Sequence, residues 1–361
     1  MNSLIICNTP YQIMNAVNII VNNVAGITKE GTDILIDKVF KNADIIGNRL
    51  LKEKIVNNVY YADHIKEVPK RSKFKCLIDL VMGDFHEETL DYSYELRKEN
   101  QYDTIWVGDT NSLGLILYGR NRKAKIFWYD DGVASYSKPP EAFNHTTIYC
   151  LFASFLKLGG YKYSSNLIYL NNPEMIQYSG YLARQLPQYT SDNKATEMLN
   201  YVFNYQKKYS LLDQYKTIIL TQVLPLSAEY EGIDAPKLFS GTHADLSSLL
   251  IRKHPRDTKE YQNCRIDSGL NMWEMECLNG ITDDHVLIAC CSTAQITPKM
   301  LAGKEPYVYF LHRFLLGENS TIKDGFEKLV NSIKEMYFHK EKIIVPDSID
   351  AFRESISKII L

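Results

Sequence analysis

Three short groups of polar residues follow apolar runs, where their side chains could take part in a reaction. The first group is Asp130-Asp131-Gly132, which comes directly after the run Lys125–Tyr129. One carboxylate of such a pair can act as a general base while the other binds backbone, and the glycine permits a tight bend. An ordinary turn has the same composition, so the group taken alone leaves both interpretations open.

The second group is a histidine among cations. His254-Pro255 is flanked by Arg252, Lys253 and Arg256 at the end of a strand-like apolar run. Histidine can give up a proton near neutral pH, and the surrounding cations favour a bound anion. We therefore expect His254 to act at an anion, and a solvated basic strand end is the alternative.

The third group, Ser292-Thr293, joins the apolar run Val286–Ala289 to a helical pattern over Ala294–Leu301. The N–H groups at a helix start attract anions, and two hydroxyls can donate to phosphate oxygens without a metal. The group therefore predicts a phosphate site, and a plain Ser/Thr helix cap is the alternative.

The order of the three groups outlines one reaction. A nucleotide sugar would place its phosphate at Ser292 and Thr293, and His254 would protonate the leaving phosphate. A carboxylate of the Asp pair would then deprotonate an acceptor hydroxyl. A CMP-activated sugar leaves with one phosphate, so we expect no metal and no cofactor besides the donor substrate. Asp283-Asp284 precedes a strand-like run, and we interpret it as a turn.

Short β-branched runs alternate with helical patterns in two series, which predicts two α/β domains with parallel sheets. A length of 361 residues suits two domains, and a turn-rich stretch places their boundary near residue 190. The first series has strands at Leu4–Cys7, Ile34–Ile36, Thr104–Val107 and Ile126–Tyr129, and helices at Ile13–Asn22 and Glu88–Asn100. The second has strands at Thr217–Leu220, Leu249–Ile251, Val286–Ala289, Tyr307–Phe310 and Ile343–Val345, and helices at Trp273–Leu278, Ala294–Leu301 and Phe326–Met336. The last helical pattern, Ile349–Ile359, could pack on either domain.

Ligands of open α/β sheets bind beyond the carboxyl ends of the strands, so residues just after each strand are candidates for substrate binding. They are Asn8, Thr9, Tyr11 and Gln12 after the first strand, and Asp109 after Thr104–Val107. An ordinary helix cap explains the first segment equally well. The sequence has neither GxGxxG nor a P-loop, which argues against a dinucleotide enzyme or an ATPase.

The composition is that of a globular protein with 41 basic and 43 acidic residues, which gives no indication of nucleic-acid binding. The longest apolar stretch, Ile148–Leu156, is too short to span a membrane, and the N-terminus lacks a basic leader. We expect a cytoplasmic protein. Any contact with the inner face of the plasma membrane would be peripheral.

The groups at 130–132, 254–255 and 292–293 resemble, in this order, motifs shared by several bacterial sialyltransferase families. Those motifs are acidic-acidic-Gly, His-Pro and Ser-Ser/Thr. With Cys7–Gln12 and Lys253–Arg256, the chain is most similar to glycosyltransferase family 52, the lipooligosaccharide and capsule sialyltransferases.

This resemblance implies a GT-B fold, in which two Rossmann-like domains face each other across a cleft. Residues 1–190 would form the acceptor-side domain and 191–361 the nucleotide-sugar domain. His254 would be the general acid supported by Pro255, while Ser292 and Thr293 would hold the CMP phosphate. Lys253 and Arg256 would assist at that phosphate.

The implied activity is metal-independent, inverting transfer of sialic acid from CMP-sialic acid to a galactose-ended glycan of a capsule or lipooligosaccharide. The implied partners are the nucleotide sugar and the glycan, and some members of the family form homodimers. Two alternatives stay open. One is transfer from another nucleotide sugar on the same fold, and the other is a non-catalytic glycan-binding or scaffold protein.

The identity of the base is open at this stage. In the lipooligosaccharide enzymes the base lies in the loop after the first strand of the second domain, and here that loop contains Glu229 and Glu231 but no aspartate. Families with the acidic-acidic-Gly motif use its first acidic residue, which favours Asp130 over Asp131. Strand alternation does not say which of the two carboxylates faces the acceptor.

Overall fold

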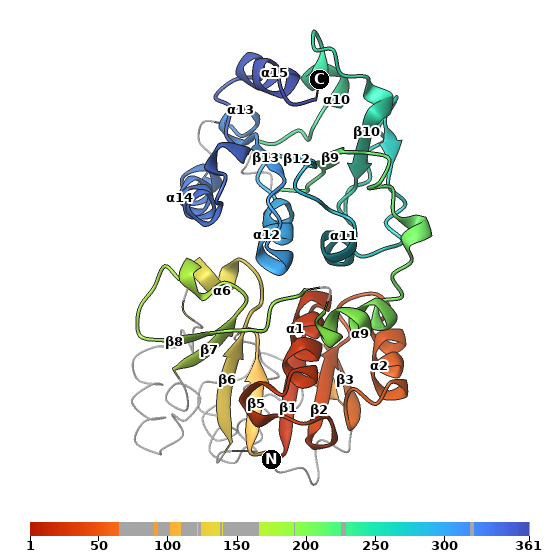
Figure 1. Ribbon diagram of the computed structural model, residues 1–361, viewed down its shortest axis with the longest axis vertical. Coiled ribbons are helices and arrows are strands. Elements are labelled where there is room, and N and C mark those ends of the chain that lie inside the picture. Colours follow the sequence, from red (N-terminus) through yellow and green to blue (C-terminus); the bar gives the residue numbers. More distant parts are fainter. Residues whose placement is uncertain are drawn as a thin grey trace, which may run out of the picture. The chain divides into compact units, whose positions relative to one another are not determined.

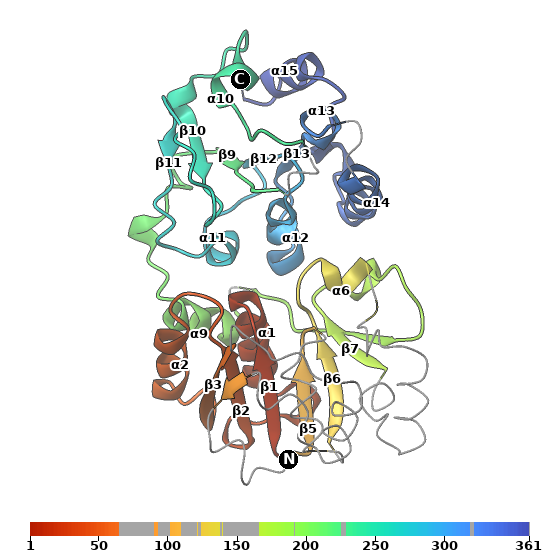
Figure 2. The same cartoon turned by 180° about the vertical axis from the view of Figure 1, so that it is seen from behind.

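The computed structural model describes residues 1–64, 90–92, 102–109, 121, 124–137, 139, 166–190, 192–224, 229–317 and 321–360. The chain divides into two compact units, unit 1 (Met1–Val202) and unit 2 (Phe203–Leu361). Each unit is built on a mostly parallel sheet with helices packed on it (Figure 1, Figure 2). This confirms the predicted α/β class.

Unit 1 contains an eight-stranded sheet in the order β4-β3-β2-β1-β5-β6-β7-β8. Its strands are β1 (Ser3–Cys7), β2 (Thr32–Asp37), β3 (Asn58–His64), β4 (Leu90–Tyr92), β5 (Thr104–Val107), β6 (Lys125–Tyr129), β7 (Leu167–Leu170) and β8 (Leu182–Gln185). Its described helices of at least one α-helical turn are α1 (Pro10–Val21), α2 (Ala43–Lys52), α6 (Ala134–Ser137) and α9 (Lys194–Val202). The chain runs outward from β1 to β3 on one side and resumes at β5 on the other, so strand order reverses between β1 and β5.

Strand β1 and helix α1 form because the sequence supplies a fully buried apolar strand and then a helix start. All five residues of β1 are buried. The Thr9 hydroxyl caps α1 by accepting a hydrogen bond from the Gln12 N–H at 3.1 Å, and Pro10 occupies the first turn. The helical pattern expected over Ile13–Asn22 is thereby confirmed, with an earlier start.

The helix predicted over Glu88–Asn100 is wrong for the part that the structure describes. Leu90–Tyr92 form strand β4, which pairs antiparallel with β3 in the register Ala62↔Tyr92. The hydrogen-bonding edge of β3 outweighs the local helical periodicity there. The rest of that pattern, like Ile148–Leu156, lies outside the described residues.

The unit boundary lies at Val202 rather than near residue 190. Helix α9 packs against α1 and α2 of unit 1. Arg49 Nη1 also donates to the Val202 carbonyl at 3.0 Å, which holds the end of α9 on this unit. Residues 191–202 therefore belong to unit 1, because an amphipathic helix belongs with the surface on which its apolar face is buried.

Unit 2 contains a six-stranded sheet in the order β11-β10-β9-β12-β13-β14, and every pair in it is parallel. The strands are β9 (Thr217–Leu220), β10 (Leu249–Arg252), β11 (Arg265–Ile266), β12 (Val286–Ala289), β13 (Tyr307–Phe310) and β14 (Ile343–Ile344). The helices are α10 (Ala235–Phe239), α11 (Trp273–Asn279), α12 (Thr297–Ala302), α13 (His312–Leu315), α14 (Thr321–Met336) and α15 (Ile349–Ser357). Strand order reverses here between β9 and β12.

Two apolar clusters cover the two faces of this sheet. Ile219 of β9 packs with α10 and α15, whereas Ile218 and Leu220 pack with α11 on the other face (Figure 1). The last helix therefore belongs to unit 2, since Phe352 and Ile356 of α15 are fully buried in the first of these clusters. Alternation along a two-sided parallel strand explains the pattern.

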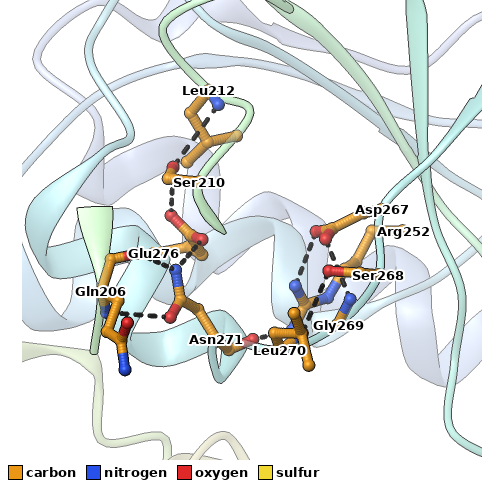
Figure 3. Close-up of polar contacts among 10 residues, drawn as sticks. All are labelled: Gln206, Ser210, Leu212, Arg252, Asp267, Ser268, Gly269, Leu270, Asn271 and Glu276. Atoms are coloured by element: carbon orange, nitrogen blue, oxygen red, sulfur yellow. Dashed lines mark hydrogen bonds and ion pairs between the residues drawn. The ribbon is translucent and has the colours of Figure 1, made fainter. Parts of the chain in front are cut away.

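A buried polar network ties the start of unit 2 to its own sheet. Asn271 exchanges hydrogen bonds with the Gln206 backbone at 3.1 and 3.0 Å and donates to Glu276 at 2.8 Å (Figure 3). Ser210 donates to the second oxygen of Glu276 at 2.7 Å. The segment after Val202 is thus held by unit 2.

Within the described ranges, no helix is long and apolar enough to cross a membrane.

Candidate functional site

The carboxyl ends of β1, β5 and β6 bring together polar side chains of unit 1. Asn8 Nδ2 donates to Asp109 Oδ1 at 2.9 Å. Gln12 links this pair to Asp131, because its amide donates to Asp131 Oδ1 at 2.5 Å and accepts from the Asn8 N–H at 2.5 Å. The cluster lies where strand order reverses, the usual ligand position in such sheets.

Gly108 allows Gln12 to reach Asp131. A Cβ atom on Gly108 would lie 2.5 Å from Gln12 Nε2, which is closer than such atoms approach. Any other residue at this position would displace the amide. Gln12 is itself fully buried, so its orientation is fixed by these neighbours.

Asp131 has the electrostatics of a general base. Burial raises the pKa of its carboxyl to about 7, and the nearby charges of Asp109 and Asp130 add to the rise while the Gln12 amide opposes it. A carboxylate with a pKa near the working pH is well suited to taking a proton from a hydroxyl.

Asp130, in contrast, is a structural carboxylate. It is fully buried and accepts hydrogen bonds from the Gly132 N–H at 2.8 Å, the Asn171 N–H at 2.9 Å and the Tyr136 hydroxyl. Both of its oxygens are occupied, although burial still raises its pKa. The geometry therefore favours Asp131 over Asp130 as the base, the reverse of the order expected from the motif.

Two expected substrate residues of unit 1 have structural contacts. Thr9 caps α1, and the Tyr11 hydroxyl accepts from Asn171 Nδ2 at 3.1 Å. Asn171 follows β7 directly and also donates to Asn15 and Asp130. Asn171 was not among the residues expected from the sequence, although its place directly after a strand end is the signal that pointed to the other candidates.

In unit 2, the backbone around His254 fixes the imidazole. The His254 N–H donates to the Thr221 hydroxyl at 2.9 Å, and the Arg256 N–H donates to His254 Nδ1 at 3.1 Å. The neutral ring therefore carries its proton on Nε2. Partial burial and the charge of Arg256 lower its pKa below 6.5, and Asp257 opposes them.

The three cations near His254 have different roles. Arg252 is half-buried and pairs with Asp267 at 2.6 Å while donating to the Asn271 carbonyl, so it stabilises the fold (Figure 3). Lys253 Nζ donates to the Lys259 carbonyl at 2.7 Å. Arg256 and the adjacent Pro255 are exposed. Arg256 is thus exposed beside the histidine, whereas Lys253 is partly engaged by the loop and keeps further N–H donors on its ammonium.

Ser292 and Thr293 lie at the carboxyl end of β12, as expected. Ser292 Oγ accepts from the Ala294 N–H at 3.3 Å, and Thr293 is exposed. The helix expected over Ala294–Leu301 is a short 3-10 turn followed by α12, because Pro298 lacks an N–H and starts a new helix. Ser292 is therefore a helix cap, which leaves its own hydroxyl proton for a ligand.

The two glutamates of the loop after β9 are exposed. Glu229 has a left-handed backbone with φ of 50°, and its carboxylate lies against Gly317. Asp283 and Asp284 form a turn before β12, as expected.

No group of three or more His, Cys, Asp or Glu side chains in the described part of the chain is arranged to hold a metal ion.

Comparison with known proteins identifies the fold. No family model matches the sequence, and no curated protein does. The chain is similar to the GT-B domain of a sialyltransferase from Photobacterium damselae, with a TM-score of 0.51 and 14% identity over 95% of this chain and 99% of that one. It is also similar to a spinosyn rhamnosyltransferase (TM-score 0.46, 9% identity, 100% and 91% of the two chains) and to a UDP-GlcNAc 2-epimerase from Neisseria meningitidis (TM-score 0.40, 14% identity, 100% and 99%). The chain therefore has the GT-B fold.

Proposed function

We propose that the chain is an inverting glycosyltransferase that moves sialic acid from CMP-sialic acid to a galactose-ended glycan of a capsule or lipooligosaccharide. One observation carries the proposal. The three groups expected to carry the chemistry, around Asp131, His254 and Ser292, all follow the carboxyl ends of parallel strands that lie at the reversal point of their sheet or one strand away from it. The GT-B fold supports the transferase class, and one similar structure is a sialyltransferase.

Unit 2 holds the nucleotide in this proposal. The hydroxyls of Ser292 and Thr293 donate to the CMP phosphate, and Lys253 and Arg256 offset its charge. His254 donates a proton to the leaving phosphate oxygen as the bond between this oxygen and the anomeric carbon breaks. Because these groups meet the charge of a single phosphate, the proposed reaction needs no divalent metal.

Unit 1 supplies the base. Asp131 takes the proton of the acceptor hydroxyl, whose oxygen then attacks the anomeric carbon from the side opposite to the leaving phosphate. Attack from that side inverts the configuration at the carbon. Asn8, Gln12 and Asp109 keep the Asp131 carboxylate in place and offer polar atoms to the sugar.

The test is to incubate the protein with CMP-sialic acid and a panel of galactosides and to measure released CMP and the heavier glycan by mass spectrometry. Parallel reactions contain UDP- and GDP-sugars, and thermal shifts with CMP, UDP and GDP report which nucleotide stabilises the fold. Transfer from CMP-sialic acid that is lost in Asp131→Asn and kept in Asp103→Asn supports the proposal. Asp103 is the control because it precedes β5 and so lies at the amino ends of the parallel strands, away from the candidate site.

Two other results would overturn the donor or the enzyme class. Transfer from a UDP- or GDP-sugar, with none from CMP-sialic acid, would overturn the proposed donor but not the proposal that the chain is a glycosyltransferase. Binding of a glycan without turnover of any nucleotide sugar, and without stabilisation by any nucleotide, would make the chain a glycan-binding protein.

A further inference from the structure

Two residues at the end of the central strand of unit 2 connect the loops that carry His254 and Ser292. Thr221 and Gln222 directly follow β9, which lies between β10 and β12 in the sheet. The loop after β10 carries His254, and the loop after β12 carries Ser292. The two side chains are therefore placed to contact both loops.

Thr221 holds the histidine loop. Its side chain is buried at 4% exposure, and its hydroxyl accepts from the His254 N–H at 2.9 Å. The Thr221 side chain also helps to lower the pKa of the Asp257 carboxyl. That carboxylate accepts from the Lys259 N–H at 2.9 Å and from the Tyr261 hydroxyl at 2.8 Å. A hydroxyl that accepts from a backbone N–H keeps its own proton, so Thr221 can meet the His254 backbone and the Asp257 carboxylate together.

This network reaches the imidazole through the turn that follows it. The Asp257 N–H donates to the His254 carbonyl at 2.8 Å, and the Arg256 N–H donates to Nδ1 at 3.1 Å. Closing the turn occupies Nδ1 and leaves Nε2 as the atom that can meet a ligand. The position of Thr221 and Asp257 thus determines which ring nitrogen carries the proton.

Gln222 holds the other loop. Its side-chain oxygen accepts from the Cys291 N–H at 2.8 Å, and its amide nitrogen lies 3.8 Å from Cys291 Sγ. Cys291 immediately precedes Ser292, so the contact fixes where the Ser292 backbone begins its turn. The partners lie 69 residues apart in the sequence, and a contact over that distance restrains the loop against the sheet.

We propose that Thr221 and Gln222 are positioning residues that fix His254 and Ser292 relative to each other, so that both act on one phosphate. The inference rests on the proposed function, which takes that phosphate to belong to the donor nucleotide. Thr221 governs proton transfer through the histidine. Gln222 governs nucleotide affinity through the serine.

The first experiment is 15N NMR of the His254 ring in the ligand-free protein. In the wild type the ring is the Nε2–H tautomer; in Thr221→Val we expect a mixture of the two neutral tautomers. Thr221→Ser keeps the hydroxyl and restores the wild-type signals. Thr217→Val, the same change at the other end of β9, leaves them unchanged. Signals that are identical in Thr221→Val and wild type would overturn the inference.

The second experiment separates the two residues by function. Thr221→Val lowers kcat at least about tenfold while the Kd for CMP stays within about twofold, since the acid is misplaced and the phosphate site is not. Gln222→Met weakens CMP binding about five- to tenfold, the usual effect of one lost hydrogen bond, and leaves the His254 signals in place. Equal effects of both variants on Kd and kcat would contradict separate roles.

The two proposals fail in different ways. If no nucleotide sugar is turned over but Thr221→Val shifts the His254 signals, the positioning role stands and the transferase proposal falls. If the wild type transfers sialic acid and Thr221→Val changes neither the signals nor kcat, the positioning role falls alone. If Thr221→Val does not fold, Asp257→Asn perturbs the same contacts from the histidine loop, and the 15N signals of the His254 ring report the effect in the same way.

Discussion

Replacing Asp131 by asparagine should make the protein more stable at alkaline pH and inactive. The pKa of the folded carboxyl is about 7, against an ordinary value of 3.8. Because the folded value is raised, the stability that Asp131 contributes is fully present below about pH 3.8 and is lost as the pH rises through 7. A pKa difference of about three corresponds to at most about 4 kcal/mol, and residual exposure reduces it. The asparagine avoids this cost because it stays neutral.

We expect Asp131→Asn to exceed the wild type in free energy of unfolding by more at pH 8 than at pH 5, and the two proteins to converge below about pH 3.8, apart from small packing effects. Urea unfolding followed by tryptophan fluorescence reports this directly, because Trp106 and Trp128 are buried in unit 1. Turnover should fall by about 10²–10⁴-fold, the usual contribution of a general base. Asp103→Asn is the control for loss of one negative charge. A variant whose stability advantage is the same at both pH values would refute the raised pKa, and near-normal turnover would refute the role as base.

Three further results follow from the same geometry. His254→Ala should lower turnover by about 10²–10⁴-fold with CMP affinity largely kept, and turnover near wild type would remove the acid from the mechanism. Transfer should persist in excess chelator; activity that is lost and then restored by magnesium or manganese would overturn the metal-free proposal. The double change of Ser292 and Thr293 to alanine should weaken CMP binding by about 1–3 kcal/mol, measured by calorimetry, and an unchanged Kd would place the phosphate elsewhere.

The sequence predicts the sheets well because their strands are buried runs whose pattern is local. Thr217–Leu220, Val286–Ala289 and Tyr307–Phe310 are strands with the expected bounds. The predicted helix over Glu88–Asn100 fails in part because β4 depends on the free edge of β3, a partner that no local pattern reveals. The expected boundary near residue 190 differs from the observed one at Val202 because α9 packs against α1 and α2 of unit 1, and no local pattern reveals that contact.

The roles within the site depend on contacts between distant residues. Motif order favours Asp130, yet its carboxylate accepts a hydrogen bond from the N–H of Asn171, 41 residues further along the chain, which gives it a structural contact that the sequence does not reveal. The resemblance points to a carboxylate in the segment after β9, whereas Thr221 and Gln222 contribute a hydroxyl and an amide there. Thr221 meets His254 and Gln222 meets Cys291 across 33 and 69 residues. Residue types at strand ends therefore indicate where the candidate site lies, and the role of each residue in it depends on tertiary contacts.

The pKa values of the proposed base and acid stand in the reverse of the usual order. The reaction needs Asp131 ionised and His254 protonated, whereas the pKa of Asp131 is about 7 and that of His254 lies below 6.5. Because the two pKa values stand in this order, only a minority of chains have both groups in the required state at any pH. Activity, measured as kcat/KM, therefore falls above about pH 7 although the base is ionised there. The fall is caused by deprotonation of His254, which further ionisation of Asp131 no longer offsets. In the proposed reaction, a phosphate at Nε2 would favour the imidazolium and would oppose the burial and the Arg256 charge that lower the pKa of His254 in the free protein. His254 would then be an effective acid only when a nucleotide is bound.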